Sequence, residues 1–320
     1  MIWLAWRQHR ADVLVVAGGL ALAVIGLVWL EISMSGAISQ LGLGRCTNMR
    51  TQACLQLANT FENWFPGVRP VLLFFVAIPL LLGMFVGAPL VAREVEQKTH
   101  WLVWAQSVGR GRWLLVQVAG VLLLGVVAMT ALTLAVNWAV APLLQVFIQA
   151  RQTNQLDQPW FDVIGIVPVT YTVFALALGI STGALLPRTL PAMLMVLGIF
   201  LVMRLSVASF RADYQPPITV HQTVTSNESL AEANTRLTAR DPAGAWVTGS
   251  WITDRNGRIV SGVVDCGPTT GRSCSQYTRW ITYQPADRYW RFQAIESGIY
   301  LILSALLLAL TAYWVRRRVA

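Results

Sequence analysis

Long apolar segments alternate along the chain with short polar stretches that carry arginine. Each apolar segment is about as long as a helix that crosses a bilayer, which takes roughly 20 residues. The pattern predicts six transmembrane helices, at residues 13–30, 71–91, 113–140, 165–186, 190–207 and 295–315. We therefore expect an all-α integral membrane protein.

A long polar segment separates the fifth and sixth predicted helices. Residues 208–292 are too polar to cross lipid and too long for a simple connection, so we expect a small, mostly β domain there. Trp251–Thr253 and Arg258–Val260 alternate as strands do, and the Asn256-Gly257 step between them is a hairpin signal. Residues 229–239 are compatible with one short helix. The chain divides into residues 1–207 with five helices, the domain at 208–292, and residues 293–320 with the sixth helix and a basic tail.

Composition agrees with a membrane protein. Of 320 residues, 55% are hydrophobic and 12% charged, whereas roughly 25% are charged in an ordinary soluble domain. Tryptophan prefers the membrane–water interface, and seven tryptophans fall at predicted helix ends: Trp29, Trp64, Trp113, Trp138, Trp160, Trp290 and Trp314. A soluble protein is excluded.

Basic residues are distributed unequally between the two ends of the predicted helices. Ten flank the helices on one side: Arg7, Arg10, Arg93, Lys98, Arg110, Arg112, Arg188, Arg316, Arg317 and Arg318. Four lie in or beside the short loops of the other side: Arg45, Arg50, Arg69 and Arg151. Short basic loops stay in the cytoplasm, so we expect both termini to be cytoplasmic and residues 208–292 to be extracytoplasmic. The net charge of +9 thus reflects topology and not a nucleic-acid-binding stripe.

All four cysteines fall in segments that the charge distribution places outside. They allow three pairings, and an oxidising exterior favours two local disulfides, Cys46–Cys54 and Cys266–Cys274. A zinc site is disfavoured because no C-x-x-C pair or nearby histidine supplies the usual ligand spacing.

Two short motifs place glycines four residues apart inside predicted spans. Gly179 to Gly183 also matches the G-x-S-x-G motif of hydrolases, which would make Ser181 a nucleophile. That motif needs a strand-to-helix turn and a histidine partner, whereas this segment is apolar and helical. The spacing therefore favours close helix packing at Gly179 and Gly183, and likewise at Gly83 and Gly87.

The chain carries no obvious energy source of its own. Lys98 is the only lysine and follows no glycine-rich loop, so there is no phosphate-binding P-loop. Charged residues near the spans, such as Arg69, Arg204 and Glu296, lie close to helix ends, where we expect them to extend toward water. With no intramembrane proton relay, energy would come from elsewhere.

Residues 93–112 form the cytoplasmic stretch between the second and third predicted helices. On a helix Trp101, Trp104 and Val108 share one face, with Glu94 and Lys98 among the polar groups around it. Such an amphipathic helix either docks a partner or anchors the two spans at the interface, and its composition leaves both readings open.

Several blocks of sequence, together spanning nearly the whole chain, resemble the membrane subunits of type 2 ABC transporters, of the kind common in actinobacteria and related bacteria. They are Trp3–Arg10, Gly87–Glu96, Thr99-His100, Trp104–Val108, Gly165–Val169, Arg188–Met193, Tyr283–Ala286 and Phe292–Glu296. The chain departs from the family pattern at Lys98, where glycine is usual, and at Trp101, where an aliphatic or basic residue often follows the histidine.

This resemblance implies a permease subunit without catalytic residues, driven by a separate ATPase that binds ATP and magnesium. Two ATPase copies would join two permease halves, identical or homologous, in a bacterial plasma membrane. The residues expected to contact the ATPase are Glu94, Glu96, Thr99, His100, Trp101 and Trp104. No cofactor or metal is expected in the chain itself.

The expected function is outward transport of an amphiphile such as an antimicrobial peptide, a drug or a lipid-like molecule. The outward direction is implied by the resemblance alone. The alternative is a sensor or force-transmitting unit that acts through its extracytoplasmic domain without transport. A hydrolase using Ser181 is the third and weakest reading.

Overall fold

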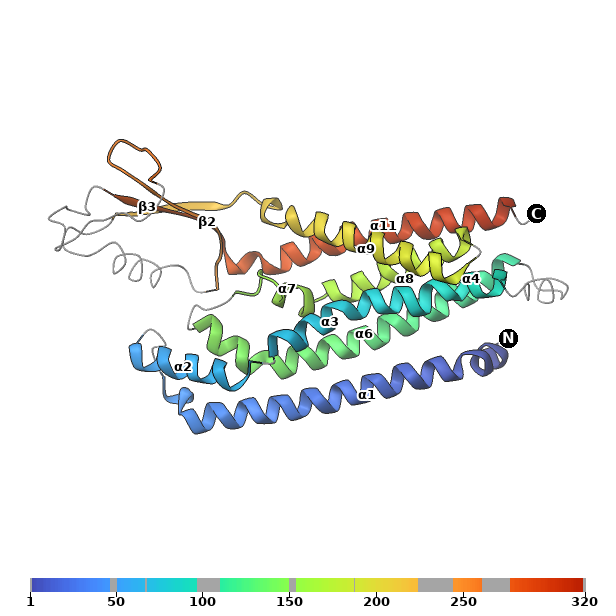
Figure 1. Ribbon diagram of the computed structural model, residues 1–320, viewed down its shortest axis with the longest axis horizontal. Helices are drawn as coiled ribbons and strands as arrows, with labels where there is room; N and C mark the ends of the chain where they lie inside the picture. The colour runs from blue at the N-terminus through green and yellow to red at the C-terminus, as the bar shows by residue number, and fades with distance from the viewer. Residues whose placement is uncertain are drawn as a thin grey trace.

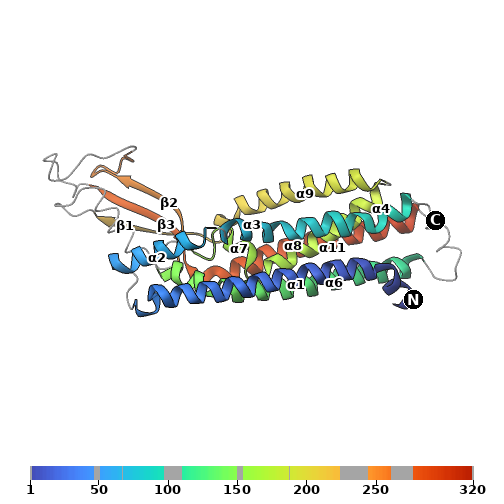
Figure 2. The same cartoon turned by 60° about the horizontal axis from the view of Figure 1, so that its bottom comes forward.

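The computed structural model describes residues 2–46, 51–66, 68–96, 110–149, 154–186, 188–223, 244–260 and 277–318. Long helices run side by side, and a small sheet lies beyond one end of them (Figures 1 and 2). Both termini lie at the opposite end of the bundle (Figure 1). We call these two ends the sheet end and the terminal end.

Six helical segments are long and apolar enough to cross a membrane. They are Gly18–Leu41, Pro70–Ala92, Leu115–Leu144, Val167–Leu185, Thr189–Ser209 and Ala286–Trp314. The helices that contain them are α1 (Ile2–Leu41), α3 (Val68–Leu82) with the π-helical turn η2 (Gly83–Gly87) and α4 (Ala88–Glu96), α6 (Arg110–Gln149), α8 (Val167–Leu185), α9 (Thr189–Ser209) and α11 (Tyr289–Arg318). This is the number of spans that the apolar pattern predicts.

The segment after the first span differs from the prediction. The apolar pattern predicts that the first span ends at residue 30, but α1 continues to Leu41 and α2 follows at Gln52–Trp64. Glu31 does not end the helix, because one charged residue is tolerated near a span end, where its carboxylate accepts a hydrogen bond from Ser35 at 2.8 Å.

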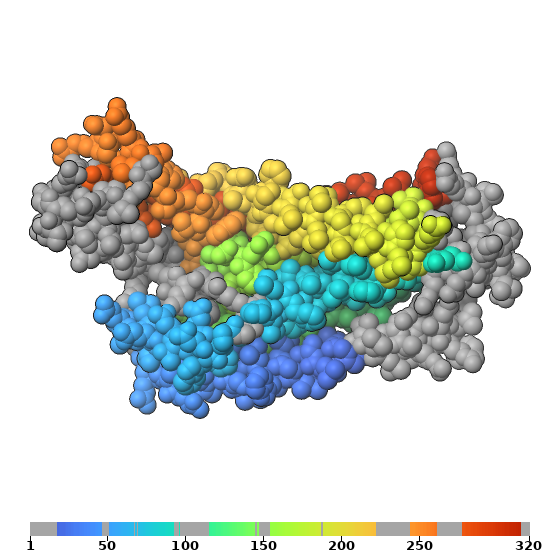
Figure 3. All heavy atoms as spheres, in the orientation of Figure 1, coloured from blue at the N-terminus to red at the C-terminus, as the bar shows by residue number. Residues whose placement is uncertain are grey.

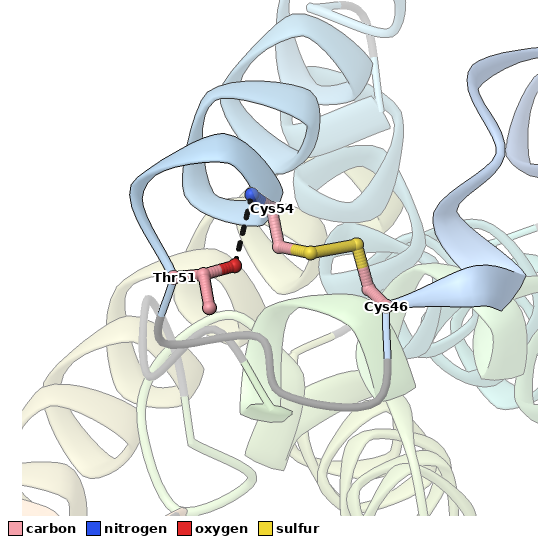
Figure 4. Close-up of a disulfide and its surroundings, with 3 residues drawn as sticks. All are labelled: Cys46, Thr51 and Cys54. Atoms are coloured by element: carbon pink, nitrogen blue, oxygen red, sulfur yellow. Dashed lines mark hydrogen bonds between the residues drawn. A yellow bond between two sulfur atoms is a disulfide. The ribbon is translucent and has the colours of Figure 1, made fainter.

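A disulfide closes the turn between α1 and α2. Cys46 and Cys54 are bonded, with their Cα atoms 6.0 Å apart. Thr51 caps α2, because its hydroxyl accepts a hydrogen bond from the Cys54 amide at 3.4 Å (Figure 4). The other expected pair, Cys266 and Cys274, lies outside the described residues.

Helix α8 is the centre of the bundle. In its apolar window 83% of residues are buried, against 17–33% in the other five spans. The remaining helices therefore expose much apolar surface, as lipid-facing helices do. Figure 3 shows α9 along one face of the bundle, where its most exposed large side chains are Leu190, Leu194, Val202 and Leu205.

The small domain is an antiparallel sheet in the order β1-β3-β2. Its strands are β1 (Ile218–Thr223), β2 (Trp246–Thr253) and β3 (Thr278–Gln284). The expected hairpin turn follows β2: the Asp254 carboxylate accepts hydrogen bonds from the amides of Asn256 at 2.9 Å and Arg258 at 2.8 Å. The expected helix at 229–239 lies outside the described residues.

Candidate functional site

Glycines allow the backbone of α8 to pack directly against the backbone of the second span. A Cβ atom added to Gly83 would lie 2.6 Å from the Ala175 carbonyl oxygen, and one added to Gly87 would lie 3.0 Å from that of Leu176. On the facing side, Gly179 packs on the Gly83 carbonyl and Gly183 on the Ala88 carbonyl. All four glycines singled out from the sequence thus lie in one interface.

Ser181 lies between Gly179 and Gly183 and faces the sixth span. Its hydroxyl donates to the carbonyl oxygens of Ala177 at 2.7 Å and Leu307 at 3.2 Å, and it accepts from the Thr311 hydroxyl at 2.8 Å. These contacts join α8 to α11 as interhelical polar contacts do in membranes. Among the described residues, none of these contacts involves the histidine that the G-x-S-x-G motif requires.

Four charged side chains meet at the sheet end inside the bundle. Asp162 comes from α7 (Trp160–Val163), Arg204 from α9, Arg211 from the 3₁₀ turn η3 (Arg211–Asp213), and Glu296 from α11. All four are buried: Asp162 is 4% exposed, Arg204 8%, Arg211 2% and Glu296 0%. We call them the charged cluster.

Every member of the charged cluster is paired. Arg204 bonds Asp162 and lies 3.3 Å from Glu296 Oε1, while Arg211 Nη2 lies 3.0 Å from Asp162 Oδ1. Tyr171 and Tyr214 also donate hydrogen bonds to Glu296. Two acids and two bases balance, as buried charges require.

Burial and the neighbouring carboxylates together shift the pKa values of two groups just outside the spans, Arg211 and Tyr214. Burial alone would lower the pKa of the Arg211 guanidinium, but the carboxylates of Asp162 and Glu296 outweigh burial and raise it above its usual value. Burial, reinforced by Glu296, raises the pKa of the Tyr214 phenol. Arg211 is thus held charged and Tyr214 neutral.

This arrangement corrects our expectation that Arg204 and Glu296 extend toward water. The two side chains point inward because their partners are supplied by α7 and η3, far away in the sequence. The missed signal was the presence of two acids and two bases at corresponding ends of the predicted spans.

Gln293 joins three elements one turn before Glu296. Its side-chain oxygen accepts hydrogen bonds from the amides of Ile166 and Val167, each at 3.0 Å, and so caps the start of α8. Its side-chain nitrogen donates to the carbonyl oxygens of Phe161 at 3.0 Å and Ile164 at 3.2 Å. We did not single out this residue as functional from the sequence.

Two side chains hold the end of the sheet to the segment that follows Arg211. Gln284, the last residue of β3, donates to the carbonyl oxygens of Ala212 at 2.9 Å and Gln215 at 2.6 Å. Arg288 donates to the Pro216 carbonyl oxygen and to Gln284 Oε1, each at 2.7 Å. These hydrogen bonds therefore hold the end of β3 and the turn before α11 to the segment between α9 and β1.

At the terminal end, α4 reaches the start of α9. Glu96 Oε2 accepts hydrogen bonds from the Thr189 hydroxyl at 2.7 Å and the Thr189 amide at 3.3 Å. The Thr189 hydroxyl, followed by the Thr189 amide and by Arg188, lowers the pKa of the Glu96 carboxyl. Glu96 thereby caps α9 from another helix.

Of the expected ATPase-contacting residues, the structure places only part. Glu94 and Glu96 lie in α4, but only the Glu96 side chain is described, and it is exposed. Thr99, His100, Trp101 and Trp104 lie outside the described residues.

Comparison with known proteins identifies the family. Residues 17–211, more than half of the chain, match the family described as ABC-2 membrane transporter related. The chain belongs to this family. Membership indicates that the chain is a multi-pass membrane protein and the permease subunit of an ABC transporter. It also implies partnership with an ABC ATPase. No curated protein and no solved structure matched the chain.

Proposed function

We propose that this chain is the membrane subunit of an ATP-driven exporter that moves an amphiphile outward across a bacterial plasma membrane. The observation that carries the proposal is the family match over five of the six spans in a chain with no P-loop. A separate ATPase would bind ATP and magnesium, and this subunit would catalyse nothing itself.

We assign the terminal end to the cytoplasm and the sheet end to the outside. Two observations support this: the arginine-rich short loops belong to the terminal end, and both termini lie at that end (Figure 1). The Cys46–Cys54 disulfide then falls on the oxidising side.

Residues 93–112 would be the segment that receives the ATPase. The contact between Glu96 and Thr189 supports a route into the bundle, because it connects this segment to α9. Movement of the segment would reach α9 directly, and the glycine contacts of α4 would carry it to α8.

Two such subunits, identical or homologous, would enclose the transport path with two ATPases. A single bundle leaves one side of any path open to lipid, and its outer helices expose apolar side chains along their length.

One observation favours the alternative of a sensor or force-transmitting unit. Gln284 and Arg288 bind the sheet closely to the segment after α9, so a load on the sheet would pass into α9 and α11. Cargo-stimulated transport into vesicles supports the exporter, whereas ATP-driven movement of the sheet without transport supports the alternative.

Co-expression with the ATPase encoded beside this gene tests the proposal. We expect the ATPase to co-purify with the wild-type permease and to lose coupled ATP turnover with Glu94→Ala/Glu96→Ala and with Trp101→Ala. Asp213→Ala, an exposed acid in η3 at the sheet end, is the matched control and should retain coupling. Absence of any permease-dependent turnover with the wild type would end the transporter hypothesis.

A further inference from the structure

An open pocket of about 360 Å³ lies at the sheet end. Its walls come from the last turns of α6, from the residues before α8, and from the start of α11. The lining residues are Asn137, Val140, Ala141, Leu144, Gln155, Ile164, Gly165, Tyr289 and Trp290. This volume lies in the range of small-molecule sites.

Three polar side chains in the pocket wall have hydrogen-bond donors or acceptors that no described residue uses. Among the described residues, neither the Asn137 amide nor the Gln155 amide has a hydrogen-bond partner. The Tyr289 hydroxyl accepts a hydrogen bond from Gln293 at 3.1 Å, and no described acceptor takes its own proton. Asn137 is half-buried near the end of its span, so a ligand in the pocket would offer its amide hydrogen-bond partners that the described residues do not.

The nine described residues that line the pocket carry no charge. The nearest acid on α7, Asp162, is already held by Arg204 and Arg211 in the charged cluster. An ionic ligand would therefore bring a charge that none of these nine residues balances. Hydroxyl and amide groups suit this wall, because they both donate and accept hydrogen bonds.

Neighbouring residues indicate the depth of the pocket in the membrane. Trp138 and Trp290 are 50% and 62% exposed, as expected of residues at the level of the lipid head groups. Leu134 is 64% exposed and precedes Asn137 by one turn on the same face of α6, toward the middle of the span. A molecule whose polar group lies in the pocket could thus place an apolar chain along this surface of α6.

We propose that this pocket binds the uncharged, hydroxyl-bearing head group of an amphiphile, with its acyl or alkyl chain lying along α6. This inference requires that the chain spans a membrane, but it requires neither ATPase coupling nor a direction of transport. It narrows the class of amphiphile that the proposed permease would recognise.

Native mass spectrometry of the detergent-purified full chain tests the pocket. The probes are dioleoyl lipids with three heads: a neutral glucosyl head, the anionic phosphatidylglycerol head, and a neutral methyl ether that carries no hydroxyl group. We expect the wild type to retain the glucosyl lipid about fivefold better than the other two, which is the value of roughly one neutral hydrogen bond. Free glucose, which lacks the chain, should not compete.

Three variants locate the binding. Asn137→Leu removes the amide and Ala141→Phe fills the space, so each should abolish the preference for the glucosyl lipid. Gln56→Leu makes the same kind of change on the exposed surface of α2, outside the pocket, and should leave the preference unchanged. Equal retention of all three lipids by the wild type, or a preference that survives both pocket variants, would overturn the proposal.

The two proposals fail separately. If the lipid preference is absent but the ATPase co-purifies, the lipid-binding proposal is rejected and the permease proposal stands. If the lipid preference is present but the ATPase is not coupled, the permease proposal is rejected and the lipid-binding proposal stands.

Discussion

Arg211 and Glu296 form a bidentate ion pair in the interior of the bundle, at its sheet end. Arg211 Nε lies 3.0 Å from Glu296 Oε2, and Nη2 lies 3.0 Å from Oε1. Both side chains are buried, and the pair joins the start of the extramembrane segment to α11. A planar guanidinium matches a carboxylate in this geometry.

Breaking this pair should destabilise the protein strongly. Arg211→Met leaves the Glu296 carboxylate buried with less compensation, which costs about 3–5 kcal/mol. We expect a clear fall in the thermal midpoint of the detergent-purified chain, while Arg255→Met, at an exposed turn residue, should change little.

The double variant Arg211→Met/Glu296→Met sharpens this test. Removing both charges leaves Asp162 paired with Arg204, so the double variant should lose less stability than the sum of the two single variants. Additive losses would mean that Arg211 and Glu296 do not act as a pair.

Substitution of Gly179 should separate α8 from the second span. Gly179→Ala places a methyl group against the Gly83 carbonyl, and such overpacking costs about 1–3 kcal/mol. Gly198→Ala, on α9 with open space around it, should be neutral or stabilising by about 0.5–1 kcal/mol. Thermal unfolding of the two variants compares them directly, and equal effects would argue against the close approach.

The contact between Glu96 and Thr189 should depend on pH. The folded-state pKa of Glu96 is lowered, so its contribution is present above the ordinary carboxyl pKa and is lost as pH falls through the lowered value. Hydrogen exchange at the start of α9, corrected for the intrinsic rate, should then report less protection of the Thr189 amide.

Glu96→Gln provides the control for this pH dependence. The glutamine oxygen still accepts from Thr189 but does not titrate, so protection in the variant should stay constant over the same pH range. A pH response of the same size in both proteins would assign the titration to another group.

The disulfide between Cys46 and Cys54 should stabilise the turn between α1 and α2. Cys54→Ser should lower the free energy of unfolding by about 2 kcal/mol, because the bond restricts the unfolded chain. Peptide mapping without reduction measures the pairing itself. It should recover the Cys46–Cys54 peptides linked and, as the sequence predicts, the Cys266–Cys274 peptides linked as well.

Features that depend on local pattern could be predicted from the order of the residues alone. Runs of apolar residues long enough to cross a bilayer located the six spans, and the turn at Asp254–Gly257 followed from short-range signals. The spacing of Gly83, Gly87, Gly179 and Gly183 likewise predicted that helices approach closely there. These features depend on neighbouring residues, which a single sequence displays directly.

Contacts between residues far apart in the chain became visible only in the folded protein. Glu296 looks like any charged residue near a span end, until α7 and η3 bring Asp162 and Arg211 to it. Gln293 becomes a cap only because α8 begins beside α11, and Glu96 becomes one only because α9 begins beside α4. A charge near a helix end turns to water or inward according to whether a partner is there to balance it, and that partner is set by the packing of helices far apart in the chain.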